Sequence, residues 1–529
     1  MAFDPQGRLY IGVEGQWKRE GQGILRMTLT EDPASPVAVK LVEDSLIECR
    51  GLLWAHDSLY AQCNVSTQER PSGLYRLRDT NGDGRFDHVV LLRHAPGGGH
   101  GLNDLTLGPD GHIYLIQGDQ SGLPPDWDSQ QTLVRNTALD QLTDGNGQPH
   151  VYRPQPPMEG RLIRTDAEGK LWQVVACGMR NPMGVDFNTD GEAFTYEADM
   201  EWDVGLPWYR PTHVIHLVSG ADYGWRQGPD PWPMDSPDKP PAGVLTGLGS
   251  PTAVKFGTRS NFPPRYREAL FIQDWAYGRI LTVHVTPRGA GYRSDWEPFL
   301  DGRPLNVTDM EFGPDGAMYF ITGGRGTQSG LYRVRYTGPA VAPEPLSGEE
   351  QRLREEAAAA RALRRSLEAF HGRVDPAAVD AAWPHLGSDD PWVRHAARVA
   401  IEHQPAAAWQ ERAIVETDTA AALTAWLALT RAGDRLVQQA MLRKLNALDW
   451  AALSPEQQLL ALRVYELHFY RTGHPGSQTA GEVLRKLDPI YPSRSAAVDR
   501  RLSSILGYLG ARDMVGRTLQ LASAADRLG

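Results

Sequence analysis

The sequence predicts an all-β six-bladed β-propeller followed by an all-α domain of stacked helix pairs. Three observations lead to this prediction: a strand-turn-strand unit recurs along the first part of the chain, a proline-rich stretch follows it, and the remainder is rich in alanine and leucine. The predicted limits are residues 1–337 for the propeller, 338–350 for the linker and 351–529 for the helical domain.

The recurring unit joins two short apolar strands through a turn, which reads GPDG in two of the six units. It occurs in MAFDPQGRLYIGVEG, LLWAHDSLYAQCN, LTLGPDGHIYLIQGD, VDFNTDGEAFTYEAD, FPPRYREALFIQDW and MEFGPDGAMYFITGG. Pro presets φ, Asp bonds its own backbone, and Gly adopts the positive φ that closes a tight hairpin. Third strands such as SGLYRLRD and SGLYRVRY follow several units, and often a fourth, which is the composition of a propeller blade.

The two ends of the predicted propeller are short. The first unit begins inside its innermost strand, and the last ends at Tyr336 without an obvious fourth strand. A propeller usually closes by pairing strands from its two ends. We therefore expect the natural protein to carry further residues upstream of Met1.

The second half of the chain carries helix signals. In SDDPWVRHAARVAIEH, Asp390 is placed as an N-cap and Pro391 at the first helical position, with apolar residues on one face. Ser454 and Gln457 have the spacing of a capping box. The segment DPWVRHAA resembles HEAT repeats, and this resemblance implies a helical solenoid that could bind a protein partner.

Composition excludes several classes of protein. The formal net charge of -11 leaves no surplus of Lys and Arg for nucleic acid, and no apolar run approaches the roughly 18 to 20 residues that span a bilayer. Cys49, Cys63 and Cys177 are scattered, and none belongs to CxxC or CxxCH. They predict neither a disulfide framework, nor a zinc site, nor covalent haem.

Polar residues precede the repeated turns, where the inner strands begin at the central channel. These candidates for a cofactor or substrate site are Arg50, His100, Asn103, Asp104, Arg180, Asn181, Thr252, Asn306 and Thr308. His100 and Arg180 are favoured as catalytic residues because Gly, Asn or Pro beside them lets a ligand approach the backbone. Histidine also suits a general base near neutral pH.

Two acidic runs are candidate metal sites. The first consists of Glu197, Asp199, Glu201 and Asp203, which share one face of an extended segment. Four close carboxylates repel one another unless a cation, an arginine or solvent relieves them. The second consists of Asp79, Asn81, Asp83 and Asp87 in DTNGDGRFD, an incomplete calcium loop that is equally compatible with a plain Asx-rich turn.

The segments GHGLNDLTLGPDGHIYLIQGD, ACGMRNPMGVDFNTDG and VSGADYGWRQG resemble the soluble quinoprotein glucose and sorbosone dehydrogenases. These are six-bladed propellers that hold pyrroloquinoline quinone (PQQ) and Ca²⁺ over the channel. The resemblance implies that His100 takes the proton of a sugar hydroxyl, that Arg180 contacts the quinone with Asn181 beside it, and that the loop after Glu197 supplies Ca²⁺ ligands.

Over nearly the whole chain, segments such as EADMEWDVGLPWYRPTHVIHLVSGADYGWR and NVTDMEFGPDGAMYFITGGRGTQSGLYRVRY resemble a family of large bacterial membrane-bound dehydrogenases. This resemblance implies a periplasmic or cell-envelope location. Members typically add a c-type haem domain, which this chain does not contain, so the electrons would pass to a separate acceptor such as a c-type cytochrome, or to a segment that is not present in this chain.

One departure keeps other functions open. In the quinoprotein dehydrogenases, late blades supply Lys and Arg that clamp the PQQ carboxylates, whereas the matching strand here offers Asn306 and Thr308. Without cationic partners a tricarboxylate binds poorly. The alternatives to a sugar or alcohol dehydrogenase are a Ca²⁺-dependent lactonase or hydrolase, and a non-catalytic carbohydrate- or protein-binding propeller with a helical docking domain.

Overall fold

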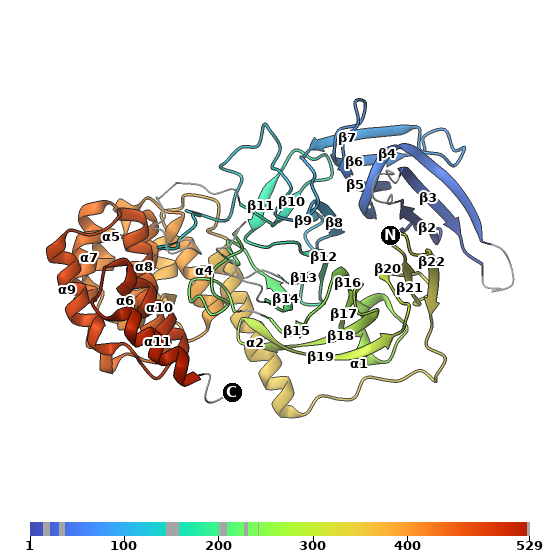
Figure 1. Ribbon diagram of the computed structural model, residues 1–529. Coiled ribbons are helices and arrows are strands. Elements are labelled where there is room, and N and C mark those ends of the chain that lie inside the picture. The colour runs from blue at the N-terminus through green and yellow to red at the C-terminus, as the bar shows by residue number, and fades with distance from the viewer. Residues whose placement is uncertain are drawn as a thin grey trace.

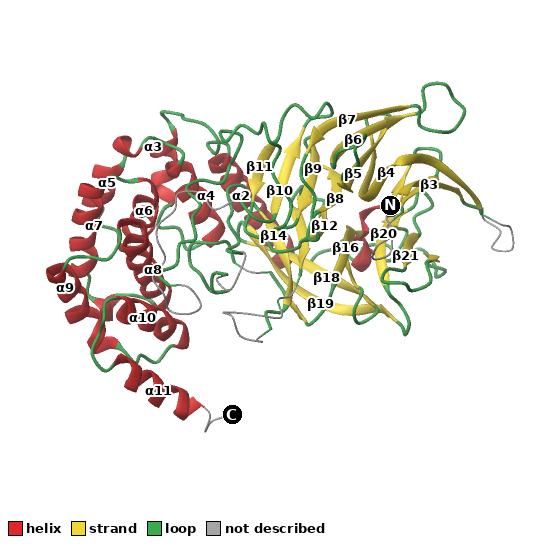
Figure 2. Cartoon of the chain, turned by 45° about the horizontal axis from the view of Figure 1, so that its top comes forward, coloured by secondary structure: helices red, strands yellow, loops and turns green. Residues whose placement is uncertain are grey.

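The computed structural model describes residues 1–13, 22–30, 37–143, 158–198, 200, 209–226, 231–241 and 243–525. In it, antiparallel sheets are arranged in a ring, and helices gather on one side of that ring (Figure 1). Figure 2 shows the same division between strands and helices after rotation.

The strands pair with their neighbours in the chain. The sheets consist of β1 (Ala2–Phe3), β2 (Arg8–Gly12), β3 (Gln22–Thr28), β4 (Ala38–Ala55), β5 (Ser58–Val65), β6 (Gly73–Arg78) and β7 (His88–His94); β8 (Leu102–Leu107), β9 (Ile113–Gln117), β10 (Arg161–Thr165) and β11 (Gln173–Ala176); β12 (Met183–Phe187), β13 (Ala193–Glu197), β14 (Thr212–Leu217) and β15 (Leu245–Gly247); β16 (Pro251–Phe256), β17 (Leu270–Asp274), β18 (Arg279–Arg288) and β19 (Gly291–Asp301); and β20 (Val307–Phe312), β21 (Met318–Thr322) and β22 (Gly330–Val334).

The predicted hairpins are confirmed. Each repeated unit forms an antiparallel strand pair, namely β1–β2, β4–β5, β8–β9, β12–β13, β16–β17 and β20–β21. The two GPDG turns are built alike: Asp110 and Asp315 each accept a hydrogen bond from the backbone two residues on, and the following glycines have φ of 76° and 73°. Between β16 and β17 the turn holds a 3₁₀ turn (Gly257–Arg259) and α1 (Pro264–Arg267).

Neighbouring units pack through their inner strands, which gives the sheets the radial arrangement of a β-propeller. Strand β4 contacts β8, β8 contacts β12, β12 contacts β16 and β16 contacts β20. The last unit meets the first where Met1, Leu9 and Ile11 pack against Ile321 and Leu331. The ring therefore closes between the first and last described strands.

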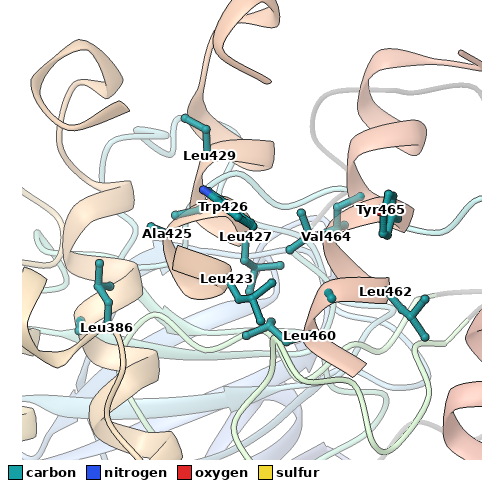
Figure 3. Packing of buried hydrophobic residues seen from close by; sticks show 14 of the residues in the cluster. Leu386, Leu423, Ala425, Trp426, Leu427, Leu429, Leu460, Leu462, Val464 and Tyr465 are labelled. Carbon is teal, nitrogen blue, oxygen red and sulfur yellow. The ribbon is translucent and has the colours of Figure 1, made fainter. Parts of the chain in front are cut away.

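The helices follow the last strand. They are α2 (Gly348–Glu368), α3 (Ala378–Ala382), α4 (Pro391–Glu402), α5 (Gln410–Val415), α6 (Thr419–Ala432), α7 (Arg435–Ala447), α8 (Pro455–Thr472), α9 (Ser477–Leu487), α10 (Ala496–Tyr508) and α11 (Met514–Ala525), with short 3₁₀ turns at Trp383–His385, Ala406–Ala408, Trp450–Ala452 and Asp488–Ile490. The caps at Asp390 and Ser454 are confirmed. Leucines of α6 pack against α8, as Figure 3 shows for Leu423, Leu427, Leu460 and Val464. None of the described helices combines the length and apolar character needed to cross a membrane.

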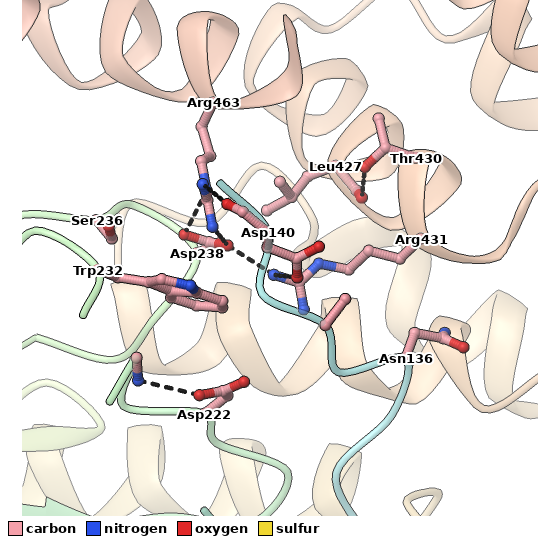
Figure 4. Close-up of polar contacts among 12 residues, drawn as sticks. Asn136, Asp140, Asp222, Trp232, Ser236, Asp238, Leu427, Thr430, Arg431 and Arg463 are labelled. Atoms are coloured by element: carbon pink, nitrogen blue, oxygen red, sulfur yellow. Dashed lines mark hydrogen bonds and ion pairs between the residues drawn. The ribbon is translucent and has the colours of Figure 1, made fainter. Parts of the chain in front are cut away.

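Buried ion pairs join the helices to loops of the ring. Asp238 accepts hydrogen bonds from Arg463 Nε and Nη2, both at 3.0 Å, and from Arg431 Nη2 at 2.6 Å (Figure 4). Arg471 Nε donates to Asp140 at 2.9 Å. Burial alone would raise the pKa of Asp238, but the guanidinium groups hold it well below its usual range. One face of the helical stack is thus already occupied by the ring.

Two buried histidines at this junction are fixed in the neutral form. His371 Nε2 bonds the Ala396 carbonyl at 3.0 Å, so its Nδ1 accepts from Ser219 Oγ at 2.8 Å. His403 Nε2 bonds the Leu133 carbonyl, and its Nδ1 accepts from Arg135 Nε at 2.9 Å. Burial lowers the pKa of His371 to about 3 and that of His403 to about 4.

We expect acid to destabilise the protein through these two residues. In the unfolded chain both imidazoles bind protons near their ordinary pKa of about 6.5, whereas in the folded protein His403 binds a proton only near pH 4 and His371 only near pH 3. Stability is therefore fully present above about pH 6.5 and is lost as pH falls toward 4. Urea midpoints at pH 7.5, 6 and 5 test this: the fall should be smaller in His371→Gln, and an equal fall in that variant would contradict the assignment.

The expectation of no disulfide is corrected in one place. Cys49 and Cys63 lie directly opposite each other on β4 and β5 and form a disulfide, while Cys177 is buried and free. We expect alkylation of the denatured, unreduced protein to label one cysteine, and alkylation after reduction to label all of them. Mass spectrometry distinguishes these states, and three labels without reduction would contradict the pairing.

Candidate functional site

The candidate site is the mouth of the ring, where inner strands begin and the next strands end. Antiparallel pairing places these two kinds of residue at one edge. Backbone hydrogen bonds repeat there: Gly118 N–H donates to Gly101 O at 2.8 Å, Trp275 N–H to Ser250 O at 2.9 Å, and Gly323 N–H to Asn306 O at 2.9 Å. The mouth therefore collects residues that follow second strands as well as the predicted residues that precede first strands.

His100 is held at this mouth by a carboxylate. Its Nδ1 is 2.7 Å from Asp119 Oδ1, and the second oxygen of Asp119 accepts from Trp225 Nε1 at 2.7 Å. The Asp119 side chain is 3% exposed, whereas that of His100 is 23% exposed. A carboxylate partner at Nδ1 favours the tautomer with hydrogen on that nitrogen. Nε2 is then left as a proton acceptor.

Arg180 and Asn181 are positioned by a buried glutamate. Glu197 Oε2 accepts from the Arg180 backbone N–H and Oε1 from that of Asn181, both at 2.9 Å. The Arg180 backbone carbonyl in turn accepts from Asp119 N–H at 2.7 Å, and its guanidinium lies 5.8 Å from the centre of the Trp225 ring. His100 and Arg180 are therefore linked through Asp119 and Trp225.

Asn103 joins the same group from the inner strand β8. Its Nδ2 donates to Asn181 Oδ1 and to the Pro182 carbonyl, both at 2.9 Å. Its Oδ1 is buried and has no hydrogen-bond partner within the part of the chain that the structure describes. A buried acceptor without a partner is costly in an empty site and favourable if a ligand donates to it.

Arg50 reaches the same mouth from β4. Its Nη1 donates to the Gly99 carbonyl at 3.2 Å, next to His100, and its Nη2 pairs with Glu48 at 3.1 Å. Asp104 lies deeper in the channel, where burial raises its pKa to about 6 against the opposing charge of Lys255. Asp104 thus belongs to the channel wall, below the mouth.

The late units contribute hydroxyl and amide groups that bond backbone carbonyls. Thr252 Oγ1 donates to Val307 O at 2.9 Å, Asn306 Nδ2 to Trp275 O at 3.3 Å, and Thr308 Oγ1 to Ile321 O at 3.2 Å. In the loop between β21 and β22, the guanidinium of Arg325 lies 5.2 Å from the centre of the Trp275 ring. A cation of the last unit therefore stands near the mouth.

Sequence reasoning missed Asp119, Trp225, Trp275 and Arg325. Asp119, Trp275 and Arg325 follow the second strands in IQGD, IQDW and ITGGR, so the ends of these strands were the available signal. Trp225 carries no such signal, because it follows the third strand of its unit by several residues and reaches Asp119 only in the folded chain.

The candidate metal ligands are only partly described. Asp199, Glu201 and Asp203 lie outside the described residues, and Glu197 uses both oxygens on backbone N–H groups. Across the described ranges, no group of three or more His, Cys, Asp or Glu side chains is placed to hold a metal ion. A calcium site formed by the segment after β13 stays a prediction.

The carboxylates of the loop DTNGDGRFD accept hydrogen bonds from groups within the same loop. Asp79 accepts from the backbone of Gly82 and Gly84 at 2.7 and 2.8 Å, and the side chains of Asn81 and Asp83 accept from backbone N–H groups two residues on. Hydrogen bonds from Thr80 lower the pKa of Asp87. These contacts are those of an Asx-rich turn.

No protein-family model and no curated protein matches the chain. Solved structures similar to it include an oxidoreductase (glucose dehydrogenase) from Thermus thermophilus, with 20% identity over 63% of this chain and 94% of that chain and a TM-score of 0.45. The PQQ-bound aldose sugar dehydrogenase from Streptomyces coelicolor has 15% identity over 63% and 92%, with a TM-score of 0.40. A protein described as a 6-phosphogluconolactonase from Bacteroides uniformis has 12% identity over 63% and 80%, with a TM-score of 0.31. These scores assign neither substrate nor reaction, so the chemistry of the site has to carry the interpretation.

Proposed function

We propose that the mouth of the ring is the active site of a PQQ-dependent dehydrogenase that oxidises a sugar or a related alcohol. The observation that carries this proposal is the pairing of His100 with Asp119. This pairing makes His100 a partly exposed base in a polar site. Asp119 and Trp225 connect it to Arg180.

In this reaction His100 Nε2 takes the proton of the substrate hydroxyl while the hydrogen on the same carbon leaves as hydride. Asp119 keeps the imidazole in the required tautomer and stabilises the imidazolium that forms. Trp225 fixes the second oxygen of Asp119, so the carboxylate cannot turn away. When bound, PQQ would supply the acceptor for the hydride.

The residues present fit PQQ as an anion. Its carboxylates require cationic partners, and Arg50, Arg180 and Arg325 approach the mouth from three different units of the ring. Arg325 supplies the late cation that the strand with Asn306 and Thr308 does not. Asn103, whose Oδ1 has no partner among the described groups, and Asn181 offer further contacts. Ca²⁺ beside Glu197 and the segment after it is part of the proposal.

The wider architecture extends the proposal. The sheets correspond to six blades if β4, which pairs with β3 and with β5, is divided between the first two. We also propose domain limits at 337 and 351, a HEAT-like character of the helices, and a protein partner on their outer face. A separate electron acceptor such as a c-type cytochrome would then receive the electrons.

A periplasmic or cell-envelope location is also proposed. The disulfide between Cys49 and Cys63 supports it, because disulfides persist in oxidising compartments.

Titration of PQQ into the calcium-loaded protein, followed by Trp fluorescence, tests the proposal. Trp225 and Trp275 stand beside Arg180 and Arg325, so bound PQQ should quench them. We expect Arg325→Gln to weaken binding about tenfold or more, the cost of one charge-assisted contact. Arg335→Gln is the control, because Arg335 is exposed just after β22, at the opposite edge of the sheet. Absence of binding by the unaltered protein would overturn the proposal, and lactone hydrolysis without PQQ would favour the lactonase.

A further inference from the structure

The segment that carries His100 does not fix its own shape. Residues 97–101 read GGGHG and belong to no helix or strand. Glycine adopts a wide range of φ and ψ, so a segment of this composition has many conformations of similar energy. The imidazole nevertheless lies 2.7 Å from Asp119, which requires one position of the His100 backbone. Residues outside the segment must therefore hold it in place.

Asn64, near the end of β5, makes contacts that hold the segment at both ends. Its Nδ2 donates to Gly98 O at 2.9 Å, and its Oδ1 accepts from the backbone N–H groups of Gly98 and Leu102 at 3.2 and 2.9 Å. Gly98 and Leu102 lie two residues before and two residues after His100. Asn64 is 6% exposed, so water competes little for these bonds. One buried side chain thus bridges the turn that presents the imidazole.

The glycines of the segment are required by its close approach to Asn64. A Cβ at Gly97 would lie 1.9 Å from the backbone carbonyl oxygen of Asn64, and a Cβ at Gly101 would lie 1.9 Å from Asn64 Oδ1. A side chain at either position would push the segment away from Asn64. On the other side, Gln120 Oε1 accepts from the His100 N–H at 3.3 Å. Gln120 therefore holds the middle of the segment, and Asn64 holds its ends.

We infer that Asn64 is a positioning residue for His100, which keeps the imidazole where Asp119 can select its tautomer. The inference rests on the proposed function, in which His100 is the base. Asn64 bonds only the backbone of the segment in the contacts above, so its effect on the reaction passes through His100. A misplacement of about 1 Å can lower a rate about hundredfold, which is the kind of loss that this contact prevents.

Hydrogen exchange on the protein without PQQ tests the contacts themselves. Asn64→Ala removes the acceptor of the Gly98 and Leu102 N–H groups, so their exchange should accelerate about tenfold, the net worth of a hydrogen bond. Gln62→Ala is the matched control, because Gln62 is a buried amide of the same strand whose Nε2 donates to Asp104 O at 3.0 Å. Unchanged exchange in Asn64→Ala would overturn the inference.

NMR spectra of isotope-labelled histidine report the imidazole directly. In the unaltered protein the hydrogen of the His100 ring should lie on Nδ1, and His100→Ala identifies the signals. We expect Asn64→Ala to give a mixture of both tautomers and Gln62→Ala to leave the signals unchanged. Circular dichroism confirms that the variants are folded. His100 signals that are the same in Asn64→Ala as in the unaltered protein would contradict the positioning role.

Kinetics connect the positioning to the reaction. With PQQ bound, Asn64→Ala should lower kcat about tenfold to hundredfold and leave PQQ affinity within about threefold. In the His100→Ala background the same change should lower kcat by no more than about twofold, because the group through which Asn64 acts is gone. Independent losses in the two backgrounds would contradict the inference. If the unaltered protein reduces no quinone, the proposed function fails, whereas exchange and NMR still decide whether Asn64 positions His100.

Discussion

Replacing His100 by alanine is expected to lower kcat for aldose oxidation by about 10²- to 10⁴-fold, the usual contribution of a positioned general base. The substrate hydroxyl then has no acceptor, because Asp119 is buried behind the imidazole and already bonded to Trp225. PQQ affinity should stay within about threefold, since the cofactor contacts belong to the arginines. Dye-linked turnover together with PQQ titration measures both quantities on one preparation.

Two further variants sharpen this prediction. Asp119→Asn keeps the size of the side chain but no longer enforces hydrogen on Nδ1, so kcat should fall while the fold is retained. His112→Ala, on the far edge of the same sheet, should leave kcat unchanged. Full activity in His100→Ala would show that His100 is not the base of the mechanism.

Replacing Asp238 by alanine is expected to lower the free energy of unfolding by about 3–5 kcal/mol, the cost of breaking a buried charge pair from one side. Arg431 and Arg463 would then lose the carboxylate that they share and keep only longer carboxylate contacts, to Asp140 at 3.9 Å and to Glu466 at 3.3 Å. Water cannot compensate, because both guanidinium side chains are at most 3% exposed. Urea unfolding followed by circular dichroism measures the loss.

Asp235 provides the matched control. It lies in the same loop as Asp238 and pairs with Arg500 at 3.0 Å, but both side chains are exposed. Asp235→Ala should therefore cost only about 0–1 kcal/mol. If both alanine variants lowered the free energy of unfolding by the same small amount, the junction would not be the buried electrostatic contact described here. The helical part would then be free to dock elsewhere.

The hairpins of the ring were predictable because turn chemistry is local. Asp110 and Gly111 form the same turn as Asp315 and Gly316, and the sequence repeats because the backbone requirement repeats. The long strand β4 was not predicted as one element. No Gly or Pro lies between Ala38 and Cys49, so the chain passes from one unit to the next without a turn.

Other features of the structure depend on contacts between residues that are distant in the sequence, and the spacing of residues along the chain does not reveal these contacts. Cys49 faces Cys63 because β4 carries a bulge just after it, which sets a register that cysteine spacing does not reveal. Asp140 and Asp238 look like ordinary loop residues in the sequence, and only the packing of α6 and α8 buries them. His100 and Arg180 were placed from flanking residues, whereas Asp119 required the antiparallel register of β8 and β9.

The most direct test of the account is an anaerobic single-turnover spectrum. The PQQ-loaded protein is mixed with one equivalent of an aldose, and the absorbance of the oxidised quinone is followed. We predict complete reduction within seconds by the unaltered protein and at least a hundredfold slower reduction by His100→Ala. A quinone that binds and stays oxidised with every aldose tested would contradict the account.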